Sequence, residues 1–388
     1  MSFDFKVLGE KLREARTSLT IEVAEAAHEI GVDEGKYRLI EQGGTGVTGD
    51  QLVILARLFR RDFRFFVTGR YPSAESQVKQ LFRRYSQLSK SDRIAIQEFV
   101  RLCEYEAFLY DQLGETFSDV PDYSSSLPVT SDRRQGEYVA VCERNRLHLD
   151  DQPIDDVFKL VRSQGIHVFR RRLADSKVSG LYIRHPAAGH CILINYHEDL
   201  FRQNFSLAHE YCHALVDAND EQLLTYETEQ SLPAEKRAHR FAGGFLVPKG
   251  YVQTHFTRPQ TYEGWVDITR QMSQVCKVNG IVSVIRLTEI NWLDSRSRTK
   301  EKLLQDRDIV TPQKGKADSE IPPDLSPGTR QRVLRLLESG LSFHFLNLCR
   351  QAYENRKVTF AKVIEMLGLP YDEAEEILAS LHFLVEVE

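Results

Sequence analysis

The spacing of apolar residues predicts helices in the first part of the chain and a mixture of strands and helices further on. Apolar positions recur at helical spacing over residues 74–117. Short β-rich runs follow at 165–169 and 191–195, and amphipathic helical segments return over 328–388. The pattern therefore predicts an α+β chain in which one small sheet lies among many helices.

Two stretches rich in turn-forming residues interrupt this pattern and divide the chain. Pro121–Pro128 and the segment from Thr311 to Pro323 are typical of linkers. A chain of 388 residues is long enough for two or three domains. The expected units are an all-helical 1–70, a helical connector and linker 71–125, a mixed domain 126–305 and a helical 325–388.

Composition excludes several classes of protein. Lys and Arg number 51 and Asp and Glu 56, so a net charge of −5 argues against a globally basic nucleic-acid coat. The six cysteines form no CxxC pair, which argues against a disulfide framework or a thiolate zinc site. No apolar run approaches the ~20 residues that cross a bilayer, and no leader pattern stands at the start. We expect a cytoplasmic protein without a membrane partner.

The strongest chemical signal is an HExxH motif formed by His209, Glu210 and His213. On a helix, residues four apart lie on one face, so both imidazoles can bind the same metal ion. Glu210 then projects beside the metal, where it can take a proton from a water. The motif predicts a metal centre with Glu210 as the catalytic base.

A site with two histidines needs a third ligand. Glu235 lies 22 residues after His213, at the start of an amphipathic helix that Pro233 can begin. Two histidines, one carboxylate and an open position form a catalytic zinc site. Glu227 and Glu229 compete with Glu235 for this role, so the spacing leaves the third ligand open.

Several motifs between about 130 and 250 resemble the ImmA/IrrE family of metallo-endopeptidases. They are Gly165-Ile166-His167-Val168, Val178-Ser179-Gly180, Ile192-Leu193-Ile194-Asn195, the segment from Arg202 to Glu210, and Glu235-x-x-Ala238-x-Arg240-Phe241-Ala242 followed by Leu246-x-Pro248. The resemblance implies a zincin-like domain with a small sheet, in which Val178–Gly180 forms a turn. It also implies that His209, His213 and Glu235 bind Zn²⁺, with Mn²⁺ as an alternative, and that Glu210 is the base. His239 stands where the family usually has Asn.

The N-terminal segment resembles the Cro/C1-type (XRE) helix-turn-helix. Residues 31–43 follow its pattern, with Tyr37 and Ile40 expected in the core. The resemblance implies that Glu34, Gly35, Lys36 and Arg38 face a DNA groove. Residues 1–70 hold 11 basic and 11 acidic residues, however, and DNA affinity draws on phosphate neutralisation. A helical domain that serves dimerisation or holds a partner is therefore the alternative to DNA binding.

The combined resemblance implies a zinc-dependent, site-specific endopeptidase that cleaves a repressor or antitoxin-like partner. One alternative is a DNA-binding regulator whose peptidase-like domain senses a signal or partner without cleaving it. Another is a protein that cleaves only itself, near residues 121–128. Tyr211, Tyr226 and His239 are the candidates for stabilising an oxyanion, and whether the chain forms a homodimer stays open.

Overall fold

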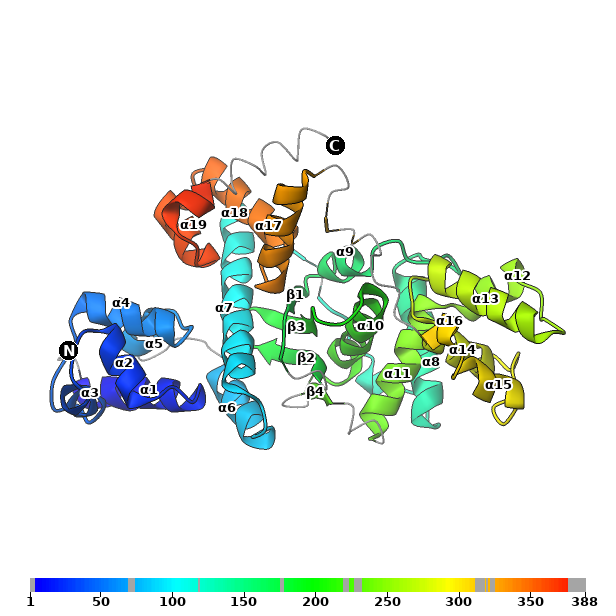
Figure 1. Cartoon of the computed structure of the whole chain (residues 1–388), viewed down its shortest axis with the longest axis horizontal. Coiled ribbons are helices and arrows are strands. Elements are labelled where there is room, and N and C mark those ends of the chain that lie inside the picture. Colours follow the sequence, from blue (N-terminus) through cyan, green and yellow to red (C-terminus); the bar gives the residue numbers. More distant parts are fainter. Residues whose placement is uncertain are drawn as a thin grey trace.

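The computed structural model is mixed α+β, with many helices around one small sheet. It describes residues 4–68, 74–117, 119–174, 178–218, 223–226, 232–310, 318, 320–321 and 325–375. Figure 1 shows the N-terminal helices at one end, a long helix and the sheet in the middle, and a further group of helices at the other end. In the described part of the chain, no helix combines the length and apolar character needed to cross a bilayer.

The first unit consists of short helices packed around a shared core. They are α1 (Phe5–Ser18), α2 (Val23–Glu29), α3 (Glu34–Glu41), α4 (Gly49–Leu58) and α5 (Arg64–Val67). Asp33 caps α3, and Thr48 with Gln51 forms a capping box on α4, so polar side chains fix where these helices begin. Tyr37 and Ile40 are buried, which confirms their expected place in the core.

Helix α7 (Lys90–Leu113) lies between the N-terminal helices and the sheet, after the shorter α6 (Glu75–Arg84). Ser89 caps its start, and Gly114 ends it in the left-handed conformation with φ of 73°. Its apolar residues share one core with the N-terminal helices, with one face of the sheet and with the C-terminal helices.

The sheet contains β1 (His167–Arg171), β2 (Val178–His185), β3 (Gly189–Asn195) and β4 (Leu223–Tyr226), in the order β1-β3-β2-β4. Strands β1 and β3 are parallel, and the other pairs are antiparallel. Cys191 and Leu193 join the core that includes α7, whereas Ile192 and Ile194 join the core on the side of α10. Both faces of β3 are covered, which explains why residues 191–194 are all apolar.

The expected turn at Val178–Gly180 is wrong, because these residues open strand β2. Val178 pairs with Tyr226 and Gly180 with Thr225, across a bulge. Pairing with a strand more than 40 residues away overrides the local signal for a turn, because a ladder supplies partners for the backbone N–H and C=O groups.

Helices form the rest of the mixed unit. They are η1 (Ser124–Ser126), α8 (Asp132–Arg146), α9 (Val157–Arg162), α10 (Leu200–Val216), α11 (Pro233–Leu246), α12 (Lys249–His255), α13 (Tyr262–Val275), α14 (Gly280–Glu289), α15 (Arg298–Leu303) and α16 (Arg307–Val310). Helix α10 packs on β2 and β3, and α11 packs on both α10 and α8. The expected alternation of strands and helices over 130–305 ends early, because the described residues 232–310 contain helices and no strand.

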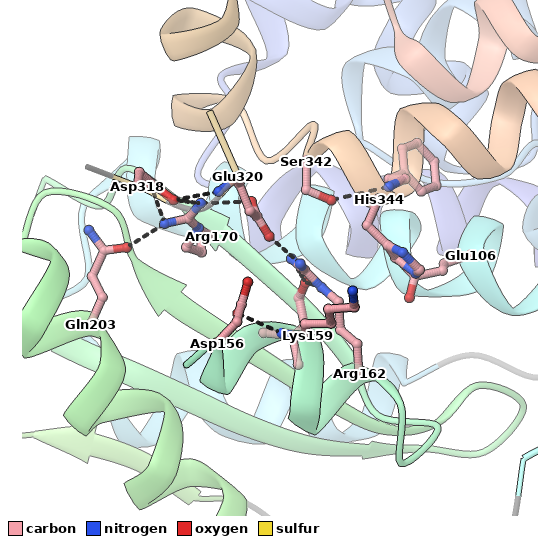
Figure 2. A network of polar contacts seen from close by, with 12 residues as sticks. Glu106, Asp156, Lys159, Arg162, Arg170, Gln203, Asp318, Glu320, Ser342 and His344 are labelled. Atoms are coloured by element: carbon pink, nitrogen blue, oxygen red, sulfur yellow. Dashed lines mark hydrogen bonds and ion pairs between the residues drawn. The ribbon is translucent and has the colours of Figure 1, made fainter. Parts of the chain in front are cut away.

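The C-terminal unit comprises α17 (Pro327–Glu338), α18 (Phe343–Glu354) and α19 (Phe360–Leu367). Helix α18 packs on α7, and α17 packs on β1. Figure 2 shows a polar network formed by β1, α9 and the residues that precede α17. In this network, Arg170 of β1 contacts Asp318 and Glu320 at 2.7 Å each. Arg162 of α9 also pairs with Glu320. Buried ion pairs therefore join the segment before α17 to the sheet.

Candidate metal centre and cleft

Helix α10 carries the HExxH motif in its buried second half. Asp199 caps the helix by accepting hydrogen bonds from the backbone N–H groups of Phe201 and Arg202. His209 and His213 are at most 2% exposed, and Glu210 is fully buried. The helix therefore presents both imidazoles on one face, inside the protein.

Glu235 comes from the first turn of α11, which packs against α10. Pro233 is the first residue of that helix, where its missing N–H and fixed φ are favourable. The Glu235 side chain is only 4% exposed. Packing of the two helices places this carboxylate against the histidine face.

The structure brings the three predicted metal ligands together. The two Nε2 atoms of His209 and His213 lie 3.2 Å apart. One carboxylate oxygen of Glu235 lies 3.1 Å from the Nε2 of His209, and the other lies 3.5 Å from the Nε2 of His213. Among the described residues, these three form the group that could hold a metal ion.

This arrangement fits a zinc ion. With bonds of about 2.0–2.1 Å, the ligand atoms of a tetrahedral zinc ion stand about 3.3 Å apart. The observed separations of 3.1, 3.2 and 3.5 Å lie close to that value, although Glu235 approaches each histidine with a different carboxylate oxygen. Two imidazole nitrogens and one carboxylate oxygen are also a common ligand set of catalytic zinc, which leaves one position for water or substrate.

A carboxylate that the sequence analysis missed supports the site. The Nδ1 atom of His213 lies 2.8 Å from an Oδ of Asp217, and Arg237 of α11 donates a hydrogen bond to the other Oδ. A proton on Nδ1 leaves the Nε2 lone pair of His213 directed at the site. Asp217 follows His213 by four residues, so the helical spacing could have identified it.

Charges in the site compensate one another. Burial opposes a charge on His213, but its hydrogen bonds with Asp217 and Glu235 outweigh burial and raise its pKa to about 10. Burial opposes a charge on Glu235 too, but the two histidines hold its pKa well below the usual range. Burial lowers the pKa of His209. Glu235 is therefore a carboxylate near neutral pH, as a metal ligand must be.

Strand β2 approaches Glu210 closely at Gly180. A Cβ atom added at Gly180 would lie 2.6 Å from Oε1 of Glu210 and 2.8 Å from its Cγ. Real Cβ atoms do not come so close, so any larger residue would displace the carboxyl group. Gly180 therefore leaves the space that the side chain of Glu210 occupies.

A cleft of about 630 Å³ opens in front of the site. Its lining includes His209 and Glu210 of α10, His239 of α11 and Ser179 of β2, together with residues of α14. The metal site therefore has a side from which a water molecule or a substrate can enter.

The three candidates for oxyanion stabilisation differ in their surroundings. Tyr211 is fully buried and its hydroxyl donates to Glu143, so it belongs to the core. The backbone of Tyr226 lies in β4, and its side chain is outside the described residues, as are Glu227 and Glu229. His239 lines the cleft, and its ring lies edge-on to that of His209, with 4.7 Å between centroids. Its buried Nε2 atom has no hydrogen-bond partner among the described residues.

The residues predicted to bind DNA lie far along the chain from this cleft, on α3. Glu34, Gly35, Lys36 and Arg38 are all exposed. Arg38 forms a weak ion pair with Glu34 at 3.4 Å, in which both side chains are more than half exposed. The helix thus presents a polar outer face, and DNA contact through it stays a prediction.

Comparison with protein families gives one match that covers the site. Residues 161–278 match the family model Peptidase_M78, described as the IrrE N-terminal-like domain. This is a family of zinc metallopeptidases, and the matched range contains His209, Glu210, His213 and Glu235. A search of curated proteins gives no match. The family match supports a metallopeptidase-like domain, and it does not extend to residues 1–70.

Proposed function

We propose that the chain is a zinc-dependent endopeptidase that cleaves a regulatory protein. The observation that carries the proposal is the convergence of His209, His213 and Glu235, with Glu210 beside them at a cleft. The match to a zinc metallopeptidase family over the same residues supports it. A repressor or antitoxin-like protein is the proposed substrate.

His209, His213 and Glu235 would hold the metal. A bound Zn²⁺ supplies a Lewis acid that polarises a carbonyl and makes a water molecule more acidic. Glu210 would accept the proton of the attacking water and return it to the leaving amine. The absence of a side chain at Gly180 leaves room for the carboxylate of Glu210 in this position, because a Cβ atom there would overlap it.

His239 would donate a hydrogen bond to the oxyanion that develops on the substrate carbonyl. Its Nε2 atom is buried, has no described partner and belongs to a residue of the cleft lining. Burial and the neighbouring His209 lower the pKa of His239 to about 3, so its ring is neutral at pH 7. A neutral imidazole can still donate one N–H, which is what this role needs.

Cleavage of another protein is favoured over self-cleavage near residues 121–128. The backbone N–H of Tyr123 donates to the carbonyl of Leu215 at 2.8 Å, and its hydroxyl donates to Glu143. Tyr211, on the other side of α10 from His209, contacts the same Glu143. This segment is therefore packed behind the metal helix, and the described lining of the cleft includes none of it.

The test compares the wild-type chain with Glu210→Gln. Both proteins are loaded with Zn²⁺ and incubated with a peptide library derived from a whole proteome, and new termini are identified by mass spectrometry. The wild-type protein should cleave a defined set of peptides, and the variant should bind zinc equally and cleave none. Equal metal content without cleavage by either protein would favour the alternative, a regulator that senses without cutting.

We also propose that residues 1–70 bind DNA. The exposed Lys36 and Arg38 on α3, beside the buried Tyr37, support this second function. Footprinting on DNA upstream of the chain's own coding sequence tests it. The double variant Lys36→Ala, Arg38→Ala should lose protection, whereas Lys249→Ala, at an exposed position on α12, should retain it. Unchanged protection by the double variant would contradict groove contact through α3.

A further inference from the structure

The cleft contains an apolar stripe that the proposed reaction does not use. Ile281 and Ile285 stand one turn apart on α14, are 37% and 43% exposed, and line the cleft. Val284 and Leu287 of the same helix are fully buried. Helix α14 therefore packs on the core with one face and offers large aliphatic side chains to the cleft with another.

Among its described lining residues, the cleft also carries more positive charge than its carboxylates neutralise. Five cations line it: Arg133, Arg202, Lys236, Arg240 and Lys300. Arg202 pairs with Glu198 at 2.7 Å, and Arg240 pairs with Glu289 at 2.8 Å. These two are therefore compensated within the protein.

The other three cations are not compensated in this way. Within the described part of the chain, no carboxylate lies within ion-pair distance of Arg133, Lys236 or Lys300. They come from three separate elements, at the starts of α8 and α11 and on α15. Apart from Glu210, the described residues of the lining include one acidic residue, Glu289, which is already engaged by Arg240 and Arg286. Although the chain has a net charge of −5, the described lining of this cleft is thus positive.

We propose that the cleft selects an acidic–apolar peptide segment. A large aliphatic or aromatic side chain packs against Ile281 and Ile285, and nearby Asp or Glu side chains pair with Arg133, Lys236 and Lys300. Burial of the apolar side chain supplies affinity, and the carboxylates steer the segment and exclude basic competitors. The inference rests on the proposed peptidase function, since it describes the substrate of the same site.

Binding of degenerate peptide pools tests the inference. Three pools of fluorescent dodecapeptides are titrated onto the full-length, zinc-loaded Glu210→Gln protein, with anisotropy as the readout. The first pool has Leu at its centre and Asp, Glu, Ala or Ser elsewhere. The second replaces Asp and Glu with Lys and Arg, and the third replaces Leu with Ser. The first pool should bind at least tenfold more tightly than the other two.

Charge reversal assigns the effect to the cleft. Lys236→Glu and Lys300→Glu should each weaken binding of the acidic pool by about three- to tenfold, and the loss should shrink at high salt. Lys249→Glu, at an exposed position outside the cleft lining, should leave it unchanged. Equal binding of the acidic and basic pools, or no effect of either reversal in the cleft, would overturn the inference.

The inference and the proposed function can fail separately. If the protein prefers the acidic pool but the wild-type chain cleaves no peptide, the binding inference is supported and the proposed peptidase function is contradicted. Cleavage of peptides with no enrichment of Asp or Glu around the scissile bond would support the peptidase function and contradict the binding inference. Preference for the basic pool would identify a substrate of the opposite charge and refute the inference.

Discussion

The Nδ1 atom of His213 lies 2.8 Å from a carboxylate oxygen of Asp217, one turn further along the same helix. This contact holds a proton on Nδ1 of His213, and Arg237 donates a hydrogen bond to the other oxygen of the same carboxylate. In the proposed zinc site, Asp217 would thus orient His213 as a ligand, although Asp217 is not itself one of the three candidate ligands. The same carboxylate keeps a proton on the buried imidazole when metal is absent.

Asp217→Asn should weaken zinc binding by about 10–100-fold, because an amide holds the imidazole tautomer less well than a carboxylate does. Competition with a chromogenic chelator on the full chain measures the affinity. Asp155→Asn is the matched control, since Asp155 is fully exposed in the same unit. Equal affinities for the wild type and Asp217→Asn would show that Asp217 does not support the site.

Gly180→Ala should reduce peptide cleavage by about tenfold or more while zinc binding is retained. The added methyl group would lie 2.6 Å from Oε1 of Glu210, and small displacements of a catalytic group are costly. Cleavage rates and zinc content are measured on the same preparation.

The control is Gly328→Ala, because a Cβ atom at Gly328 would meet no atom within 4 Å. That variant should keep the wild-type rate. A Gly180→Ala protein with normal turnover would mean that Glu210 can move without penalty, or that another group acts as the base.

The candidate metal triad was predictable because most of the sequence signals for it are local. His209 and His213 are placed by helical spacing alone, and Glu235 needed only the start of a second amphipathic helix. Spacing could not choose among Glu227, Glu229 and Glu235, because that choice depends on how α11 packs on α10. The motif resemblance implied Glu235 as the third ligand, and the structure places Glu235 next to the two histidines.

The features that sequence analysis missed are those made by distant segments. The close approach of Gly180 to Glu210 depends on how β2 lies across α10. The exposure of Ile281 and Ile285 could not be predicted either, because an apolar residue on an amphipathic helix is normally assigned to the buried face. The strand at Val178 was missed because its pairing partner is remote.

Glu320→Gln should lower the free energy of unfolding by about 3 kcal/mol, because it leaves the buried guanidinium groups of Arg162 and Arg170 without a full countercharge. Burial opposes the charge on Glu320, but the two arginines outweigh burial and hold its pKa at about 2. Urea unfolding followed by tryptophan fluorescence measures the change.

Glu354→Gln is the control for this experiment. Glu354 pairs with Arg350 at 3.0 Å on the surface, and its side chain is nearly half exposed, so its loss should cost less than about 1 kcal/mol. A Glu320→Gln protein as stable as this control would mean that the network in Figure 2 adds no stability.

The ion pair between His167 and Glu106 should make stability depend on pH. The two side chains are buried and lie 3.0 Å apart, between β1 and α7. Burial opposes both charges, but the mutual hydrogen bond outweighs it, so the pKa of His167 is raised and that of Glu106 is lowered. A raised pKa of the histidine gives stability that is complete below its unfolded value of about 6.5 and is lost as pH rises through the folded value.

The loss of stability in Glu106→Gln should therefore be larger at pH 6 than at pH 9, because His167 is charged at the lower pH and gives up its proton as pH rises. About 3 kcal/mol is expected for breaking the charged pair, and about 1 kcal/mol for losing the contact to a neutral imidazole. Urea unfolding of wild type and variant at both pH values measures the difference. Glu365→Gln is the control, because it breaks a contact with Lys362 and involves no histidine, so its effect should not change between the two pH values. If Glu106→Gln loses the same free energy of unfolding at pH 6 and at pH 9, His167 is not protonated in the folded protein.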